Sequence, residues 1–107
     1  PAAADALAVA VLALRAHLRI AHHVRGRIRL RLHASALAGD GALAAVRTLG
    51  ERLGRCPAIR RYSVNAAALS VVVEYDAARL PEHVWPELLH APPAAAAALL
   101  AVHLAAP

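Results

Sequence analysis

Basic and apolar residues alternate along residues 23–33 of this chain. Strict alternation is typical of a strand, because successive side chains on a strand point to opposite faces. The apolar positions would line a core, and the opposite face would carry His23, Arg25, Arg27, Arg29, Arg31 and His33. The pattern therefore predicts one strand over residues 23–33, with a ladder of guanidinium groups along one side.

Apolar residues at spacings of three and four predict helices elsewhere. An N-terminal helix is predicted over residues 5–20, and a second helix over about residues 41–53, where Gly54 ends it. A third helix is predicted over residues 81–90, and a short alanine-rich helix over residues 94–106.

Two more strands, residues 59–65 and 69–75, flank a short turn and predict an antiparallel hairpin. A strand, a crossover helix and a hairpin match the first three strands of a ferredoxin-like split βαβ sandwich. We therefore predict an α+β fold with a βαββα core, extra helices at both ends, and one uncovered sheet face that carries the arginines. A clear fourth strand is not predicted, because the C-terminal segment has helical character.

The composition fits one small domain with an aliphatic core. The chain has 107 residues, 30 of them alanine, and its aromatic residues are limited to one tryptophan and two tyrosines. Such a core gives modest stability, so self-association or a partner would help. All twelve basic residues are arginine and the net charge is +5, which suits acidic proteins, phosphates or anionic lipid head groups as partners.

Several classes of function are not expected. The single cysteine, Cys56, excludes an internal disulfide and every Cys-x-x-Cys metal or redox motif. We find no nucleophile with a suitably spaced base, no paired carboxylates and no glycine-rich phosphate loop, so the chain is not expected to be an enzyme. No signal peptide is recognised, and the alanine-rich helix is too short to span a bilayer, so we expect a cytoplasmic protein, with the membrane surface left open as its location.

Three histidines, His22, His23 and His33, flank the predicted strand, and imidazole is a good ligand for iron, other transition metals or haem. The ends of a strand over residues 23–33 would lie roughly 30 Å apart. His33 could then not share an ion with the other two within one chain. Exposed or structural histidines are therefore favoured, and direct binding of a metal or haem is kept as an alternative.

The arginine ladder, Arg25, Arg27, Arg29 and Arg31, is the strongest candidate for an interaction or anion-binding site. Sheets that bind single-stranded nucleic acid usually present aromatic side chains for base stacking. Here Tyr75 is predicted on the core face, so nucleic acid is disfavoured. An acidic protein surface or self-association is favoured, with Glu74 as a neighbouring counter-charge, and phosphate-bearing ligands such as nucleic acid or anionic lipid are the second choice.

Three segments of the chain, Gly26-Arg27-Ile28-Arg29-Leu30-Arg31, residues 56–65 and residues 70–76, are similar to a known family. Together they resemble the cysteine-poor branch of the heavy-metal-associated domain family over about residues 22–76. The resemblance implies a ferredoxin-like fold and a setting in metal handling, beside metal-transporting P-type ATPases or in accessory proteins of iron compartments. It implies no metal site, because residues 33–39 lack the cysteines of the copper-chaperone branch. Arg25 also departs from the proline usual in this family.

These observations divide the chain into an N-terminal helix (residues 1–21), a heavy-metal-associated-like domain (22–91) and an alanine- and proline-rich C-terminal helix or tail (92–107). The expected function is a non-catalytic accessory or scaffold role in transition-metal handling, with iron as the first choice of metal. The arginine-rich sheet face would act in self-association or in binding a partner, such as a metal-transporting ATPase or a compartment shell.

Overall fold

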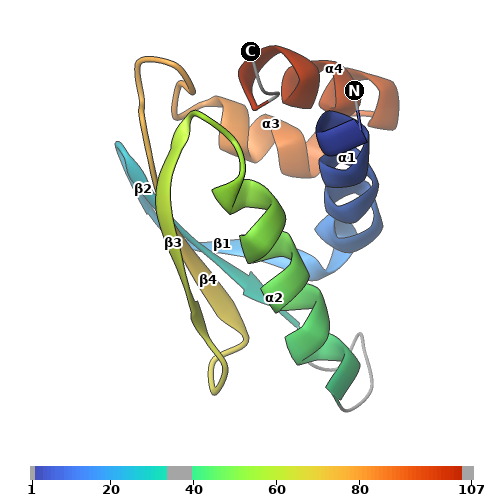
Figure 1. Cartoon of the computed structure of the whole chain (residues 1–107), viewed down its shortest axis with the longest axis vertical. Helices are drawn as coiled ribbons and strands as arrows, with labels where there is room; N and C mark the ends of the chain where they lie inside the picture. Colours follow the sequence, from blue (N-terminus) through green and yellow to red (C-terminus); the bar gives the residue numbers. More distant parts are fainter. Residues whose placement is uncertain (1, 34–39, 105–107) are drawn as a thin grey trace.

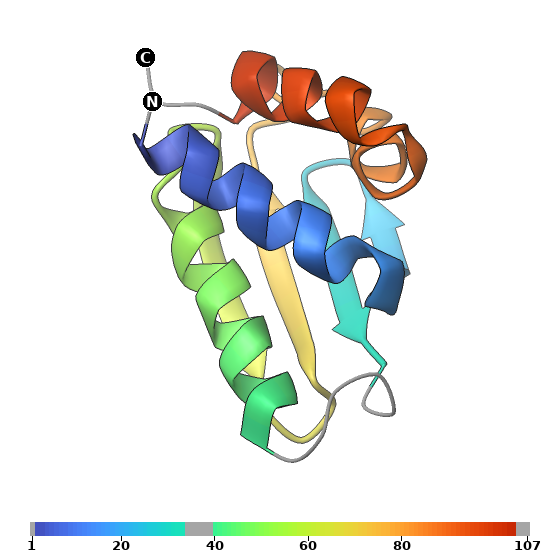
Figure 2. The same cartoon turned by 90° about the vertical axis from the view of Figure 1, so that its right-hand side faces the viewer.

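The structure, a computed structural model, describes the backbone of residues 2–33 and 40–104 and the side chains of residues 8–33 and 43–104. Within these ranges the chain forms an α+β fold in which a four-stranded antiparallel sheet is covered on one side by helices (Figures 1 and 2). The sheet has the order β1-β2-β4-β3. Its strands are β1 (Leu18–Val24), β2 (Arg27–Leu32), β3 (Ile59–Asn65) and β4 (Ser70–Tyr75).

The helix layer contains four α-helices and one short 3-10 helix in the described ranges: α1 (Ala2–Leu14), η1 (Arg15–His17), α2 (Asp40–Gly54), α3 (Val84–His90) and α4 (Pro93–His103). Helix α2 connects β2 to β3 and packs against β3. Helix α1 lies across the layer and contacts both α2 and α4 (Figure 2). Among the residues that the structure describes, no helix combines the length and the hydropathy needed to cross a membrane.

The prediction of one strand over residues 23–33 is wrong, because this segment contains a hairpin turn. Strand β1 ends at Val24, β2 begins at Arg27, and these two residues are paired. Gly26 in the turn has a φ of 87°, a conformation that glycine adopts without the steric penalty of a side chain. Arg25 continues the alternation in the sequence, but it lies in the turn.

The predicted N-terminal helix also ends earlier than expected. Helix α1 stops at Leu14, and residues 18–24 form β1, an edge strand that pairs with β2. This is the fourth strand that the sequence did not predict. The side chain of Leu18 still reaches the core, so an apolar residue with helical spacing is buried from a strand instead. Sheet pairing overrides the helical period here.

The other elements follow the predictions closely. Helix α2 and the β3–β4 hairpin lie within a residue of their expected bounds, and α3 begins three residues later than expected. Helix α4 ends at His103, and the last two residues of the predicted 94–106 helix lie outside the described part of the chain. The domain limit proposed after residue 21 falls inside β1.

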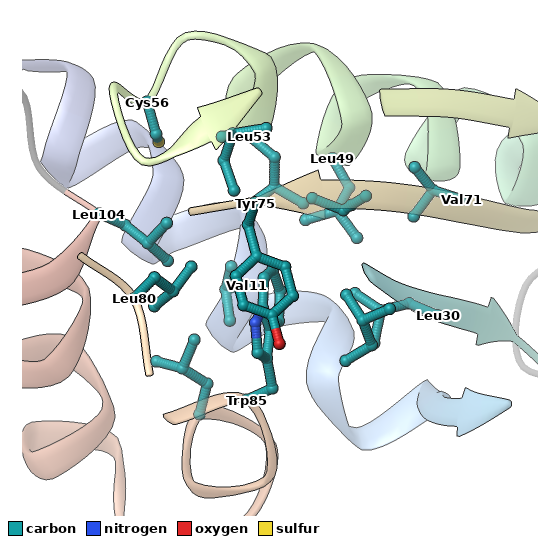
Figure 3. Close-up of a cluster of buried hydrophobic side chains, with 14 of the residues drawn as sticks. Val11, Leu30, Leu49, Leu53, Cys56, Val71, Tyr75, Leu80, Trp85 and Leu104 are labelled. Carbon is teal, nitrogen blue, oxygen red and sulfur yellow. The ribbon is translucent and has the colours of Figure 1, made fainter. Parts of the chain in front are cut away.

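One hydrophobic core lies between the sheet and the helices (Figure 3). At its centre the rings of Tyr75 and Trp85 are tilted by 56°, with their centroids 5.3 Å apart. Both terminal helices contribute to this core, Val11 from α1 and Leu100 from α4. Helices α1 and α4 therefore pack on their own domain. The largest fully buried side chains are Ile28, Leu49, Leu53, Leu80, Leu100, Leu104, Val46, Val71, Val73 and Val84.

Arg15 joins the N-terminal segment to α3. Its Nη1 donates hydrogen bonds to the carbonyl oxygens of Leu88, at 3.1 Å, and Ala91, at 2.5 Å. Both oxygens lie at the C-terminal end of α3, where unpaired carbonyls and the helix dipole favour a positive charge. Arg15 thus caps a helix more than seventy residues away in the sequence.

Candidate functional site

The side of the sheet opposite the helix layer carries no helix in the described ranges (Figure 1). Strand β2 shows why its arginines lie there: its residues are alternately exposed and buried, beginning with exposed Arg27. The buried positions point into the core, and Arg27, Arg29 and Arg31 therefore point to the open side. The structure thus places three of the four predicted ladder arginines together.

Strand β1 adds two more basic side chains to the same side. In the β1–β2 register, Arg19 lies opposite Arg31 and His22 lies opposite Arg29. A register shift between Ile20 and His22 brings these two basic residues to one side, although three positions separate them. We call the set Arg19, His22, Arg27, Arg29 and Arg31 the arginine face.

The predicted counter-charge of this face, Glu74, is occupied elsewhere. Glu74 is paired with Arg27 in the β2–β4 register, but its Oε2 accepts a hydrogen bond from Arg61 Nε at 2.5 Å. This is the only salt bridge among the described residues. The arginine face consequently has no salt bridge within the described part of the chain. Like charges directly opposite one another on a sheet are destabilising, so these residues are costly to place together.

On the other half of the open side, Arg61 of β3 and Glu74 of β4 lie opposite one another and neutralise each other in a salt bridge. Val72 and Ser70 of β4 lie opposite Arg29 and Arg31, and Ser63 of β3 lies opposite Val72. The positive charge therefore forms a stripe two strands wide, along β1 and β2. Beside it, the β3–β4 half presents the Arg61–Glu74 ion pair and the neutral side chains of Ser63 and Val72, while Ser70 is buried.

Two hollows lie along this stripe. The first, about 230 Å³, is lined by His22, Arg27, Arg29 and Val72. The second, about 320 Å³, lies toward the other end of β2 and includes Arg19, Arg31, Leu32, His33 and residues 67–69 in its lining. Guanidinium groups donate paired hydrogen bonds to carboxylates and phosphates. The arginine face can therefore hold anionic groups at more than one point along its length.

Arg25, predicted on the ladder, and His23, predicted on the same face as the ladder, lie elsewhere. Arg25 is exposed in the β1–β2 turn. His23 points to the helix side, where its Nε2 lies 2.7 Å from the hydroxyl oxygen of buried Tyr75. Burial lowers the pKa of His23, while the negative charge of Glu82 acts in the opposite direction. The prediction that His23 shares a face with the arginines is wrong.

The three histidines named as metal ligands do not converge. His22 and His23 point to opposite sides of the sheet. His33 follows β2, four residues beyond the cross-strand partner of His22, or roughly 13 Å along the strand. The expected 30 Å separation is wrong because the hairpin folds the segment back on itself. Among the described residues, no group of three histidine, cysteine or acidic side chains is placed to hold a metal ion.

Cys56 does not add a metal ligand to these histidines. Its side chain is buried, its Sγ lies 3.6 Å from the carbonyl oxygen of Arg52, and burial raises the pKa of the thiol. A protonated, buried thiol behaves as a small hydrophobic group. Cys56 is therefore part of the hydrophobic core.

The aromatic residues all lie on the helix side. Tyr75 and Trp85 are in the core, and the ring of Tyr62 covers the backbone of α2 at two glycines, Gly50 and Gly54. A Cβ atom added at Gly50 would lie 2.9 Å from the Tyr62 ring. The arginine face therefore has no phenylalanine, tyrosine or tryptophan side chain for base stacking.

Sequence reasoning missed Arg19 and placed His22 outside the sheet. The signal was present, since Leu18, Arg19 and Ile20 alternate in the same way as β2 does. Comparisons of the chain with protein-family models, with curated proteins and with solved structures return no match. The geometry of the arginine face and the sequence resemblance are therefore the basis for a functional proposal.

Proposed function

We propose that this chain is a non-catalytic accessory or scaffold domain that binds an acidic surface of a partner protein through its arginine face. The observation that carries the proposal is the exposed set Arg19, Arg27, Arg29 and Arg31, which has no salt bridge among the described residues. The setting that the resemblance implies is transition-metal handling, with iron first. A metal-transporting ATPase or the shell of an iron compartment would then be the partner.

The proposed fold family is the ferredoxin-like sandwich. Strands β2 and β3 are joined by α2, and β4 lies between them, which is the arrangement of a split βαβ unit. In a ferredoxin-like sandwich the strand that completes the sheet follows the second helix. Here β1 completes the sheet from the N-terminal side, and the chain ends in helices.

A protein partner agrees with the electrostatics of the face. Cross-strand arginine pairs repel one another, and carboxylates from a partner would replace this repulsion with charge-assisted hydrogen bonds. Docking of two arginine faces against each other would bring like charges together. An acidic partner is therefore favoured over face-to-face self-association.

The geometry gives less support to the two alternatives, which are binding of phosphate-bearing ligands and direct binding of a metal or haem by histidines. The hollow beside Arg27 and Arg29 suits a phosphate group as well as a carboxylate, but the face lacks the phenylalanine, tyrosine and tryptophan side chains that single-strand binding sheets use. Coordination of a metal or haem would need donors from several histidines, and His22 and His23 diverge.

Fluorescence anisotropy with three labelled probes tests the proposal: poly-L-glutamate, an oligo(dT) strand of equal charge, and vesicles of anionic lipid. We expect poly-L-glutamate to bind at least tenfold more tightly than oligo(dT). The double variant Arg29→Glu with Arg31→Glu should lose this binding. The matched variant Arg55→Glu with Arg79→Glu makes the same change of charge at exposed turn positions and should retain it. Equal loss in both variants, or preferred binding of oligo(dT) or vesicles, would overturn the proposal.

A further inference from the structure

We infer that the arginine face binds an extended acidic segment of its partner, with carboxylates at alternate positions aligned along β2. This inference rests on the proposed function and adds the conformation and the sequence pattern of the ligand. It depends on the spacing of Arg27, Arg29 and Arg31, on the two hollows beside them, and on the neighbouring β3–β4 half, where two opposite charges are already paired with each other.

The spacing of the arginines matches that of alternate residues in an extended chain. Arg27, Arg29 and Arg31 are successive outward positions of one strand and lie about 6.6 to 6.8 Å apart at their Cα atoms. Every second residue of an extended ligand has the same separation. Carboxylates at alternate positions can therefore meet successive guanidinium groups without a change of register along the whole strand.

The hollows give two places where such side chains can enter. One lies between β1 and β4 beside Arg27 and Arg29, and the other lies beside Arg19 and Arg31. Both are on the same stripe, so one extended segment that follows β2 passes over both. The first hollow also contacts Val72, which provides an apolar surface for the stem of an acidic side chain.

The width of the charged stripe also favours a single extended segment. The basic side chains come from two adjacent strands, which are about 4.8 Å apart. The neighbouring β4 column contributes Ser70 and Val72, and its one acid, Glu74, is paired with Arg61. A broad acidic surface would place part of its charge over this half, where Arg61 is already paired with Glu74.

An acidic helix matches the stripe less well. Residues four apart in an α-helix rise by about 6.0 Å and rotate by about 40° beyond a full turn. From the first to the third arginine, the carboxylates of the helix advance more than 1 Å less than the arginines of the strand. The third carboxylate is also rotated about 80° from the first around the helix axis. Such a helix can form ion pairs with two of the arginines but not with all three at once.

Three labelled peptides that each carry four glutamates test the inference. The first is (Glu-Thr)₄, in which the acids alternate and threonine favours an extended chain. The second has the same composition in two blocks, Glu₄-Thr₄. The third is a helical peptide with glutamate at every fourth position among alanines. We expect the alternating peptide to bind at least tenfold more tightly than the other two at 50 mM salt.

Charge reversal then shows where each peptide binds. Arg29→Glu should weaken binding of the alternating peptide at least tenfold, whereas Arg55→Glu should change it less than twofold. Equal binding of the alternating and block peptides, with both weakened by Arg29→Glu, would overturn the alternating register and leave the proposed function intact. Tightest binding of the helical peptide would overturn the extended conformation in the same way. If Arg29→Glu weakens none of the three, the proposed function fails together with the inference.

Discussion

Removal of one arginine from the arginine face should make the isolated protein more stable. Arg31 lies directly opposite Arg19 on β1 and two positions from Arg29 on its own strand. Both neighbours are exposed and have no salt bridge among the described residues. The variant Arg31→Gln removes the charge and keeps a long polar side chain.

The size of the effect follows from Coulomb's law. At a separation of about 7 Å in water, two unit charges repel by about 0.6 kcal/mol. Two neighbours at 10 mM salt, where the Debye length is about 30 Å, then give roughly 1 kcal/mol, and at 1 M salt about 0.1 kcal/mol. Part of the repulsion persists in the unfolded chain, so we expect a gain of about 0.5 to 1 kcal/mol at low salt.

Urea unfolding followed by circular dichroism at 10 mM and at 1 M sodium chloride measures this gain. Arg55→Gln is the control, because Arg55 is exposed in the turn after α2, away from the arginine face. The difference between the two variants should shrink at high salt. A variant Arg31→Gln that is less stable than the unaltered protein at 10 mM salt, or a gain that does not fall with salt, would refute the reasoning.

Three further predictions concern the scaffold. A glycine-to-alanine change inside a helix normally raises stability by about 0.5 to 1 kcal/mol, but in Gly50→Ala the new Cβ would lie 2.9 Å from the Tyr62 ring. Urea unfolding should therefore show a loss of stability with Tyr62 present and a gain in a Tyr62→Ala background. A gain in both backgrounds would contradict the packing of Tyr62 on α2. Arg15→Met should cost about 1 to 2 kcal/mol, because a charged donor to two carbonyl oxygens at the end of α3 is lost; a thermal melt that does not change would contradict this role. Burial lowers the pKa of His23 below 6.5, so His23 is protonated at a higher pH in the unfolded chain than in the folded protein, and the free energy of unfolding should fall as the pH drops through 6.5 toward the folded-state pKa. The variant His23→Gln should therefore reduce the difference between unfolding curves measured at pH 7.5 and at pH 5.5. A larger difference in this variant would contradict the predicted direction.

Much of the architecture could be predicted from local patterns. The β3–β4 hairpin and helix α2 have clear periods and clear ends, and both appear within a residue of the expected bounds. The open face of the sheet follows from the alternation in β2, where burial strictly alternates from Arg27 to Leu32. Local periodicity is a reliable guide where tertiary contacts agree with it.

The first hairpin could not be predicted from alternation alone. The pattern of basic and apolar residues runs through Arg25 without a break, although the backbone reverses there. Gly26 was the local signal, because an isolated glycine in a strand pattern marks a bend or a turn. Residues 18–24 form a strand because β2 provides an edge with which to pair, and that contact is not visible in local sequence. Because the segment was predicted as a helix followed by a single strand, Arg19 was not included in the candidate site and His23 was predicted on the wrong side of the sheet.

The central claim is that the arginine face is the interaction surface, and a heteronuclear NMR titration tests it most directly. Backbone amide and arginine Nε–Hε signals of the labelled protein would be followed as poly-L-glutamate is added at 50 mM salt. We predict that the largest shifts occur at Arg19, Arg27, Arg29 and Arg31, with little change in α1 and α4. Shifts that are largest on the helix layer, or spread evenly over all exposed arginines, would contradict the claim.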